Sequence, residues 1–170
     1  MRELLGLNRM VPLAFLVPLR LFLGASFVFT SLSKIREGWL SRPVVVTQPT
    51  ARTALASILD QFAHVNPYPP YKRFLLQVVI PKAEAFRYLI VLGELAIGLS
   101  LFTGTLARVG AFFGIVANTN YLLMKGLDPN KGLVDLAFIT GESITLLADS
   151  GRTLGVDALL RHKWPRFPLR

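Results

Sequence analysis

Long apolar segments alternate with short polar turns along this chain, and four of them are candidates for helices that cross a bilayer. Such a helix needs about 20 predominantly apolar residues at ~1.5 Å each. The predicted spans are residues 11–33, 85–103, 106–124 and 133–148, of which the last is the shortest. The pattern therefore predicts an all-α, integral membrane four-helix bundle that forms a single domain over residues 1–170.

The first apolar segment can be interpreted as a signal peptide or as a spanning helix. Its start resembles the core of a signal peptide, with Gly24-Ala25-Ser26 as a cleavage site. The segment stays apolar as far as Phe29, which favours an uncleaved spanning helix. Pro18 then lies inside the span, where a proline is tolerated if neighbouring groups satisfy the freed carbonyl.

Residues 34–84 form one long loop on the extracytoplasmic side, with two short amphipathic segments. The first runs from about Arg52 to Ala63, with Thr50 as its N-cap, and ends at the Pro-rich stretch 66–71. The second runs from Lys72 to Ile80 and ends before Pro81. Their predicted apolar faces are formed by Leu55, Ile58, Leu59 and Phe62 and by Phe74, Leu75, Val78 and Val79.

These two segments are too short to span, so we expect helices that lie along the membrane interface as a lid. Trp39, Tyr68 and Tyr71 would then sit at the level of the headgroups. The alternative is a solvated connector.

On the cytoplasmic side, Gly104 marks a tight turn between antiparallel second and third spans. Small residues occur at every fourth position in two series, which predicts close helix packing: Ala96, Ser100 and Gly104, and then Gly110 and Gly114.

Composition supports the membrane reading. Hydrophobic residues make up 52% of the chain and charged residues only 17%, against about 25% in soluble domains. The net charge of +9 comes from basic residues that flank the apolar segments, so nucleic acid is not an expected partner. The basic tail, residues 150–170, places both termini in the cytoplasm. The absence of Cys excludes disulfides and thiolate metal sites.

Polar side chains occur inside all four predicted spans at similar depths, between about 9 and 18 Å from the cytoplasmic side at ~1.5 Å per residue. They predict a buried polar network of Arg20, Glu94, Asn118, Asn120 and Glu142. We expect Arg20 and Glu94 to be direct partners, since an unpaired charge in the bilayer is costly. The network either fixes the packing of the helices or forms a quinone-headgroup or proton site.

No catalytic motif is recognisable, so the catalytic residues stay unknown and a non-catalytic subunit is favoured over an enzyme. No metal site is expected. His64 and His162 lie in the loop and the tail, where solvated side chains are the usual case. Gly151 is typical of a helix stop, and Asp157 is placed to form a salt bridge with Arg152.

The chain resembles the DoxX family of four-span membrane proteins, which includes DoxD, the small membrane subunit of thiosulfate:quinone oxidoreductases. The resemblance rests on Arg20, Gly24 and Lys34, then Gly93-Glu94-Leu95 with Gly98, Gly104 and Arg108, then Asn118, and finally the segment 151–157. It covers nearly the whole chain from about Val11 to Leu160. It implies the plasma (inner) membrane of a prokaryote.

The resemblance implies a membrane subunit of a quinone-linked electron-transfer complex that anchors its partners and does not itself hold the redox centre. Arg20, Glu94 and Arg108 are the candidate quinone or lipid contacts. No covalently bound cofactor is expected, and quinone, lipid and pigment are the contacts left open. The alternatives are a purely structural accessory subunit of a respiratory or photosynthetic complex and a stand-alone quinone-interacting protein. Lipid and other membrane subunits are the expected partners.

Overall fold

The computed structural model describes residues 13–40, 54–148, 151 and 155–157. This part of the chain is helical and contains no strand, which confirms the all-α prediction. The elements are η1 Leu13–Leu16, α1 Val17–Arg36, α2 Ala54–Val65, α3 Pro69–Phe74, the π-helical segment η2 Leu75–Val79, η3 Ile80–Lys82, α4 Ala83–Thr103, α5 Ala107–Met124 and α6 Pro129–Ala148. Thr50, Arg152 and His162 lie outside the described residues, so the predictions made for them stay predictions.

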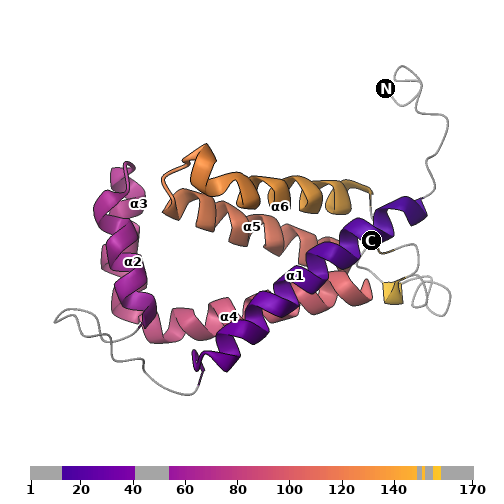
Figure 1. Ribbon diagram of the computed structural model, residues 1–170, viewed down its shortest axis with the longest axis horizontal. Helices are drawn as coiled ribbons and strands as arrows, with labels where there is room; N and C mark the ends of the chain where they lie inside the picture. Colours follow the sequence, from indigo (N-terminus) through magenta and orange to yellow (C-terminus); the bar gives the residue numbers. More distant parts are fainter. Residues whose placement is uncertain (1–12, 41–53, 149–150, 152–154, 158–170) are drawn as a thin grey trace.

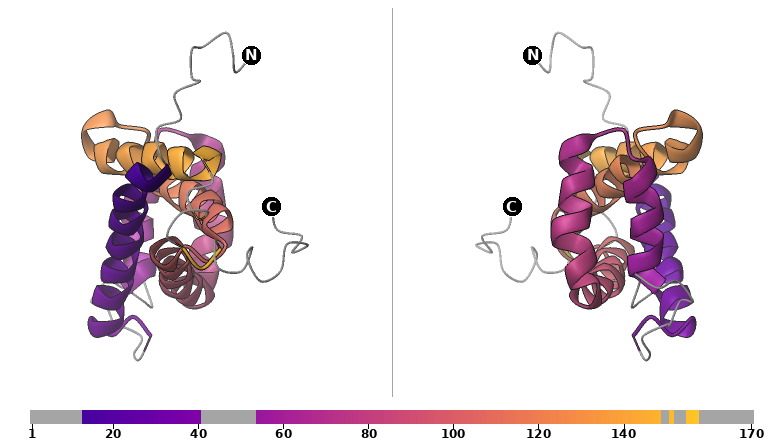
Figure 2. Two further views of the ribbon diagram at one scale, coloured as in Figure 1. Left: turned by 90° about the vertical axis from the view of Figure 1, so that its right-hand side faces the viewer. Right: turned by 90° about the vertical axis from the view of Figure 1, so that its left-hand side faces the viewer.

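The four long helices α1, α4, α5 and α6 pack on one another and are called here the long-helix core. Helix α1 lies across α4, and α5 lies beside α6 (Figure 1). Helix α4 also contacts α5, and α6 also contacts α1. Each long helix therefore has two long-helix neighbours, and α2 and α3 lie at one end of this arrangement (Figures 1 and 2).

Helix α1 begins later than the predicted first span. The α-helix starts at Val17, after the short helix η1, and continues to Arg36. Pro18 is in its first turn and not in the middle of a span. A proline fits there because its missing N–H would have no partner in the first turn and its φ is already helical. As a consequence, Arg20 lies close to the end of the helix and not deep within it.

The contact between α1 and α4 depends on two glycines that face each other. A Cβ added at Gly24 would lie 2.5 Å from Phe102 N, and one added at Gly98 would lie 2.7 Å from Val28 N. Further along, the Ser31 hydroxyl donates a hydrogen bond to the Val91 carbonyl at 2.9 Å. Residue numbers rise along α1 as they fall along α4, so the two helices are antiparallel.

Replacing Gly24 with alanine should force these helices apart, because the atoms that its methyl group would meet belong to backbone and cannot rotate away. Overpacking of this kind costs roughly 1–3 kcal/mol. The matched control is Gly93→Ala in α4, where a Cβ would meet nothing within 4 Å. Thermal unfolding in detergent should show a loss for Gly24→Ala and no loss for Gly93→Ala. Equal effects of the two substitutions would contradict the close contact.

The turn between α4 and α5 is tight, as predicted. Gly104 has φ +70° and Leu106 has φ +51°, so two residues in the left-handed region reverse the chain. The Ser100 hydroxyl bonds the carbonyls of Thr105 and Leu106, which fixes the turn to α4. Of the predicted small-residue faces, Gly110 packs on Ser100 and Gly114 on Glu142, whereas Ala96 is exposed.

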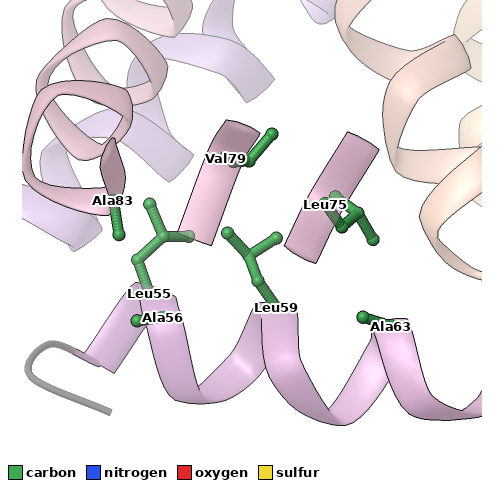
Figure 3. Packing of buried hydrophobic residues seen from close by; sticks show 7 residues of the cluster. All are labelled: Leu55, Ala56, Leu59, Ala63, Leu75, Val79 and Ala83. Atoms are coloured by element: carbon green, nitrogen blue, oxygen red, sulfur yellow. The ribbon is translucent and has the colours of Figure 1, made fainter. Parts of the chain in front are cut away.

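Helix α2 packs against the segment that leads into α4 (Figure 3). The buried residues of this cluster are Leu55, Ala56, Leu59, Ala63, Leu75, Val79 and Ala83. Half of the eight residues predicted for the two apolar faces are buried here, namely Leu55, Leu59, Leu75 and Val79. Ile58, Phe74 and Val78 are exposed. The side chain of Asn66 donates to the carbonyls of Leu123 and Met124 at the end of α5, which ties the α2–α3 connection to the long-helix core.

The predicted second interfacial helix is not a separate element. Residues Pro69–Thr103 form one continuous helical run of 35 residues, in which Pro81 lies within η3 and does not end the helix. Within the described residues this run is the one helix that is long and apolar enough to cross a membrane by length and composition. Helices α5 and α6 match the predicted third and fourth spans in position, although α6 begins four residues earlier than predicted, at Pro129.

Candidate functional site: a buried carboxylate held by three helices

Glu94 lies in the middle of α4, is 4% exposed, and is held by side chains from two other helices. Lys34 Nζ on α1 lies 2.6 Å from Oε1 and 2.5 Å from Oε2 of the carboxylate. The Tyr121 hydroxyl on α5 donates to Oε1 at 2.5 Å. The carboxylate therefore has a charged partner and a neutral hydrogen-bond donor, and the three residues are called here the Glu94 cluster.

The antiparallel packing explains why Lys34 reaches Glu94. Ser31 lies opposite Val91, so the backbone of Lys34 lies opposite the turn that precedes Val91. Side chains on a helix tilt toward its N-terminus. Because α1 and α4 run in opposite directions, the side chains of Lys34 and Glu94 tilt toward each other and meet. The ammonium group of Lys34 also lies 5.8 Å from the ring centroid of Trp39.

A second ion pair lies near the Glu94 cluster. Lys125 Nζ, after the end of α5, is 2.6 Å from Asp135 Oδ2 on α6. Asp135 is buried and Lys125 is partly buried. Tyr121 and Lys125 are one helical turn apart, so this ion pair lies at the same end of the long-helix core as the Glu94 cluster.

Arg20 is not the partner of Glu94, which corrects the pairing expected from depth. A Cβ added at Gly104 would lie 2.7 Å from Arg20 Nη1, so the guanidinium packs on the turn between α4 and α5. Gly104 is ten residues beyond Glu94, or about 15 Å along α4. Arg20 is 1% exposed, and the carboxylate of Asp157 attracts it electrostatically.

Asp157 caps the start of α5. Its Oδ1 accepts a hydrogen bond from Leu106 N at 2.7 Å, and its Oδ2 accepts one from Ala107 N at 3.0 Å. Its own backbone N–H donates to the Gly104 carbonyl at 3.0 Å. The first amides of a helix have no intrahelical acceptor, and a carboxylate there also interacts favourably with the helix dipole. We call Arg20, Gly104 and Asp157 the turn cluster.

Glu142 on α6 is fully buried and pairs with a neutral side chain. Its Oε1 accepts a hydrogen bond from Asn118 Nδ2 on α5 at 2.8 Å. Asn118 and Tyr121 are nearly one turn apart on α5, so Glu142 and Glu94 lie at neighbouring levels on two sides of that helix. The five residues predicted as one network thus separate into several sites.

The remaining candidates lie at the surface. Asn120 is exposed, its Nδ2 donates to the Val116 carbonyl, and its own carbonyl accepts from the Tyr71 hydroxyl. Arg108 is exposed in the first turn of α5. Arg108 and Glu94 therefore do not converge on one ligand. His64 is exposed beside Asp60, as expected.

The family model described as DoxX matches residues 15–122, which is more than half of the chain. The chain belongs to the DoxX family. No curated protein and no solved structure gave a match. The match contains all three residues of the Glu94 cluster, so this cluster lies entirely within the part that defines a DoxX protein.

Sequence reasoning missed several residues of this DoxX chain that the structure brings together. Lys34 was counted as a residue flanking the first span, although its long side chain reaches back into the core. Tyr121 gave no signal because an aromatic residue in a span is normally part of the packing. Asp135 and Lys125 were not singled out, and their spacing of ten residues across a turn is the signal that could have identified them as a pair. Among the described residues, no group of three or more His, Cys, Asp or Glu side chains is arranged to hold a metal ion.

Proposed function

We propose that this DoxX-family membrane protein crosses the bilayer with α1, α4, α5 and α6. The support is an apolar outer surface together with several polar and charged side chains that are buried between the helices. Large apolar side chains are exposed along all four helices, including Phe22, Phe29, Leu89, Leu92, Phe112, Phe113, Leu133, Val134 and Leu147. Arg20, Glu94, Asn118 and Glu142 are buried. Polar groups face the interior and apolar groups face outward when the solvent is lipid.

In this proposal both termini are in the cytoplasm and the membrane is the prokaryotic inner membrane. The basic residues of 150–170 favour that side. The turn cluster then lies toward the cytoplasm. Helix α2 and its packing cluster lie toward the other face, together with the Glu94 cluster and the pair Lys125–Asp135.

We further propose that the protein is a non-catalytic membrane subunit of a quinone-linked oxidoreductase, and that a quinone headgroup binds next to the Glu94 cluster. The observation that carries this is a charged, hydrogen-bonded triad that is largely buried between helices whose outer surfaces are apolar. A quinone has two carbonyl oxygens that accept hydrogen bonds. The Lys34 ammonium has a third N–H beyond its two contacts with Glu94, and the single O–H of Tyr121 would turn from Glu94 to the quinone. Trp39 beside Lys34 adds an aromatic face.

A purely structural role competes with this proposal, because Lys34, Glu94 and Tyr121 also lock three helices together. A test therefore has to separate the presence of a complex from the role of the cluster. The chain, tagged in its own host, should be purified in mild detergent. We expect it to co-migrate with a subunit whose absorbance reveals a redox cofactor, and the complex should reduce or oxidise an added quinone.

The variant Tyr121→Phe, which keeps the ion pair Lys34–Glu94, should lower quinone affinity by roughly 5–15-fold, the equivalent of one hydrogen bond of ~1–1.5 kcal/mol. Tyr68→Phe is the control, since Tyr68 precedes α3 and is 38% exposed. An assembled complex with unchanged quinone kinetics for Tyr121→Phe would indicate the structural role. A chain that migrates alone and binds quinone would indicate a stand-alone protein.

A further inference from the structure

Glu142 is buried against the backbone of α5. Its exposed fraction is 0%. A Cβ added at Gly114 would lie 2.5 Å from Glu142 Oε1 and 2.7 Å from Cδ, so the carboxyl group rests in the space that the glycine leaves. This position lies beyond residue 122, where the family match ends.

The hydrogen bonds of this carboxyl group are incomplete. Oε1 accepts from Asn118 Nδ2, whereas Oε2 has no hydrogen-bond partner within the described part of the chain. The hydroxyl of Thr145, one turn further along α6 and also 0% exposed, likewise has none there. An ionised carboxylate has about four lone-pair sites to satisfy. One amide donor satisfies a small part of that need.

The charged groups of the neighbouring helices are engaged elsewhere. On α5, Lys125 is bound by Asp135, which lies two turns before Glu142 on α6. On α1, the side chains near this part of α6 are the apolar Leu19, Leu23, Phe22 and Phe27, which contact Gly141 and Phe138. Arg20 of α1 packs on Gly104 and Gly155, and Lys34 binds Glu94. Glu142 has no ion pair among the described residues.

An ionised carboxylate with one neutral donor in an apolar interior is strongly unfavourable, and such a group is neutralised by binding a proton. We propose that Glu142 is a proton-binding site of the long-helix core, where it is a neutral carboxylic acid at neutral pH. Glu94 differs because Lys34 compensates its charge. Two carboxyl groups in different environments can thus hold different protonation states in one small protein. The ligand is a proton, and the inference does not depend on quinone binding.

Infrared spectroscopy tests this assignment directly. The protein should be purified and placed in lipid nanodiscs at pH 7. A protonated carboxylic acid has a C=O stretching band that is separate from those of carboxylates and amides, and that moves on exchange into D2O. We expect one such band from the wild type. It should disappear in Glu142→Gln, which keeps the acceptor for Asn118, and it should persist in the matched control Glu94→Gln.

A second variant tests the assignment without touching Glu142. Asn118→Leu removes the donor to Oε1, so the band should remain and move to higher frequency as the C=O group loses its hydrogen bond. This measurement also decides the matter if Glu142→Gln does not fold. No protonated band at pH 7 in the wild type would overturn the proposal. So would a band that survives in Glu142→Gln or is unmoved in Asn118→Leu.

Discussion

Replacing Lys34 with methionine is expected to destabilise the protein by roughly 3–5 kcal/mol, the usual cost of removing one partner from a buried ion pair. Glu94 is 4% exposed and would keep only the Tyr121 hydroxyl as a donor. Its negative charge would then be uncompensated in the interior. Methionine has nearly the length of lysine, so the effect reports the lost charge and not a lost volume.

Removing the negative charge of the pair should destabilise the protein less than removing the positive one. In Glu94→Gln the remaining charge belongs to Lys34, whose side chain is 22% exposed and lies near the end of α1, so it can turn toward the headgroups. The double variant Lys34→Met/Glu94→Gln should recover much of the loss of Lys34→Met, because neither charge is then left alone. Thermal unfolding of the four proteins in one detergent gives the coupling free energy.

Lys131→Met is the control, since Lys131 is 69% exposed and its pair with Asp128 is at the surface. Such a pair contributes about 0–1 kcal/mol, so its removal should change little. Strictly additive losses in the double variant would show that Lys34 and Glu94 do not interact.

The positions of the long helices were predictable because apolar residues persist for as long as each helix is buried or faces lipid. Helices α4 and α5 begin and end within two residues of the predicted spans. The start of α1 was misplaced because hydropathy does not distinguish apolar residues before a helix from those within it. Pro18 carried the signal, as a residue of the first turn.

The wrong predicted start of α1 also led to a wrong predicted partner for Arg20. The depth of Arg20 was counted from residue 11, which placed it level with Glu94, whereas Arg20 is the fourth residue of α1. Lys34 was treated as a residue flanking the first span because its backbone lies near the helix end. A depth estimate follows the backbone, but a lysine side chain extends by about a helical turn, and its direction depends on which way the neighbouring helix runs. That direction is a property of packing and not of local sequence.

The turn cluster shows a second kind of contact that the sequence analysis could not predict. Asp157 was expected to pair with Arg152, which lies outside the described residues. Among the described residues it binds the backbone amides of Leu106 and Ala107, which the sequence analysis did not predict. Backbone donors have no signature in a sequence. The glycines at 104, 151 and 155 were the indirect signal. A Cβ added at Gly151 would lie 2.6 Å from Asp157 Oδ2, and one at Gly155 would lie 2.9 Å from Arg20 Nη1. They give the aspartate and arginine room to approach the turn.

Replacing Asp157 with alanine should therefore destabilise the long-helix core although the residue lies outside it. The loss of the N-cap alone costs about 1 kcal/mol. The loss of a charge that attracts the buried Arg20 adds to it. Hydrogen exchange should rise first in the early turns of α5, because Leu106 N and Ala107 N lose their acceptors.

Asp60→Ala is the matched control, since the side chain of Asp60 is about one-third exposed and lies beside the exposed His64 on α2. It should change the unfolding temperature little. Asp157→Asn weighs the two contributions, because asparagine carries no charge but keeps one of the two acceptor oxygens that cap α5. If the electrostatic attraction to Arg20 dominates, Asp157→Asn should lose nearly as much stability as Asp157→Ala. If capping dominates, Asp157→Asn should lie between the wild type and Asp157→Ala, because one of the two capping hydrogen bonds remains. A variant Asp157→Ala as stable as Asp60→Ala, with unchanged exchange in α5, would mean that the segment 151–157 does not hold the turn between α4 and α5.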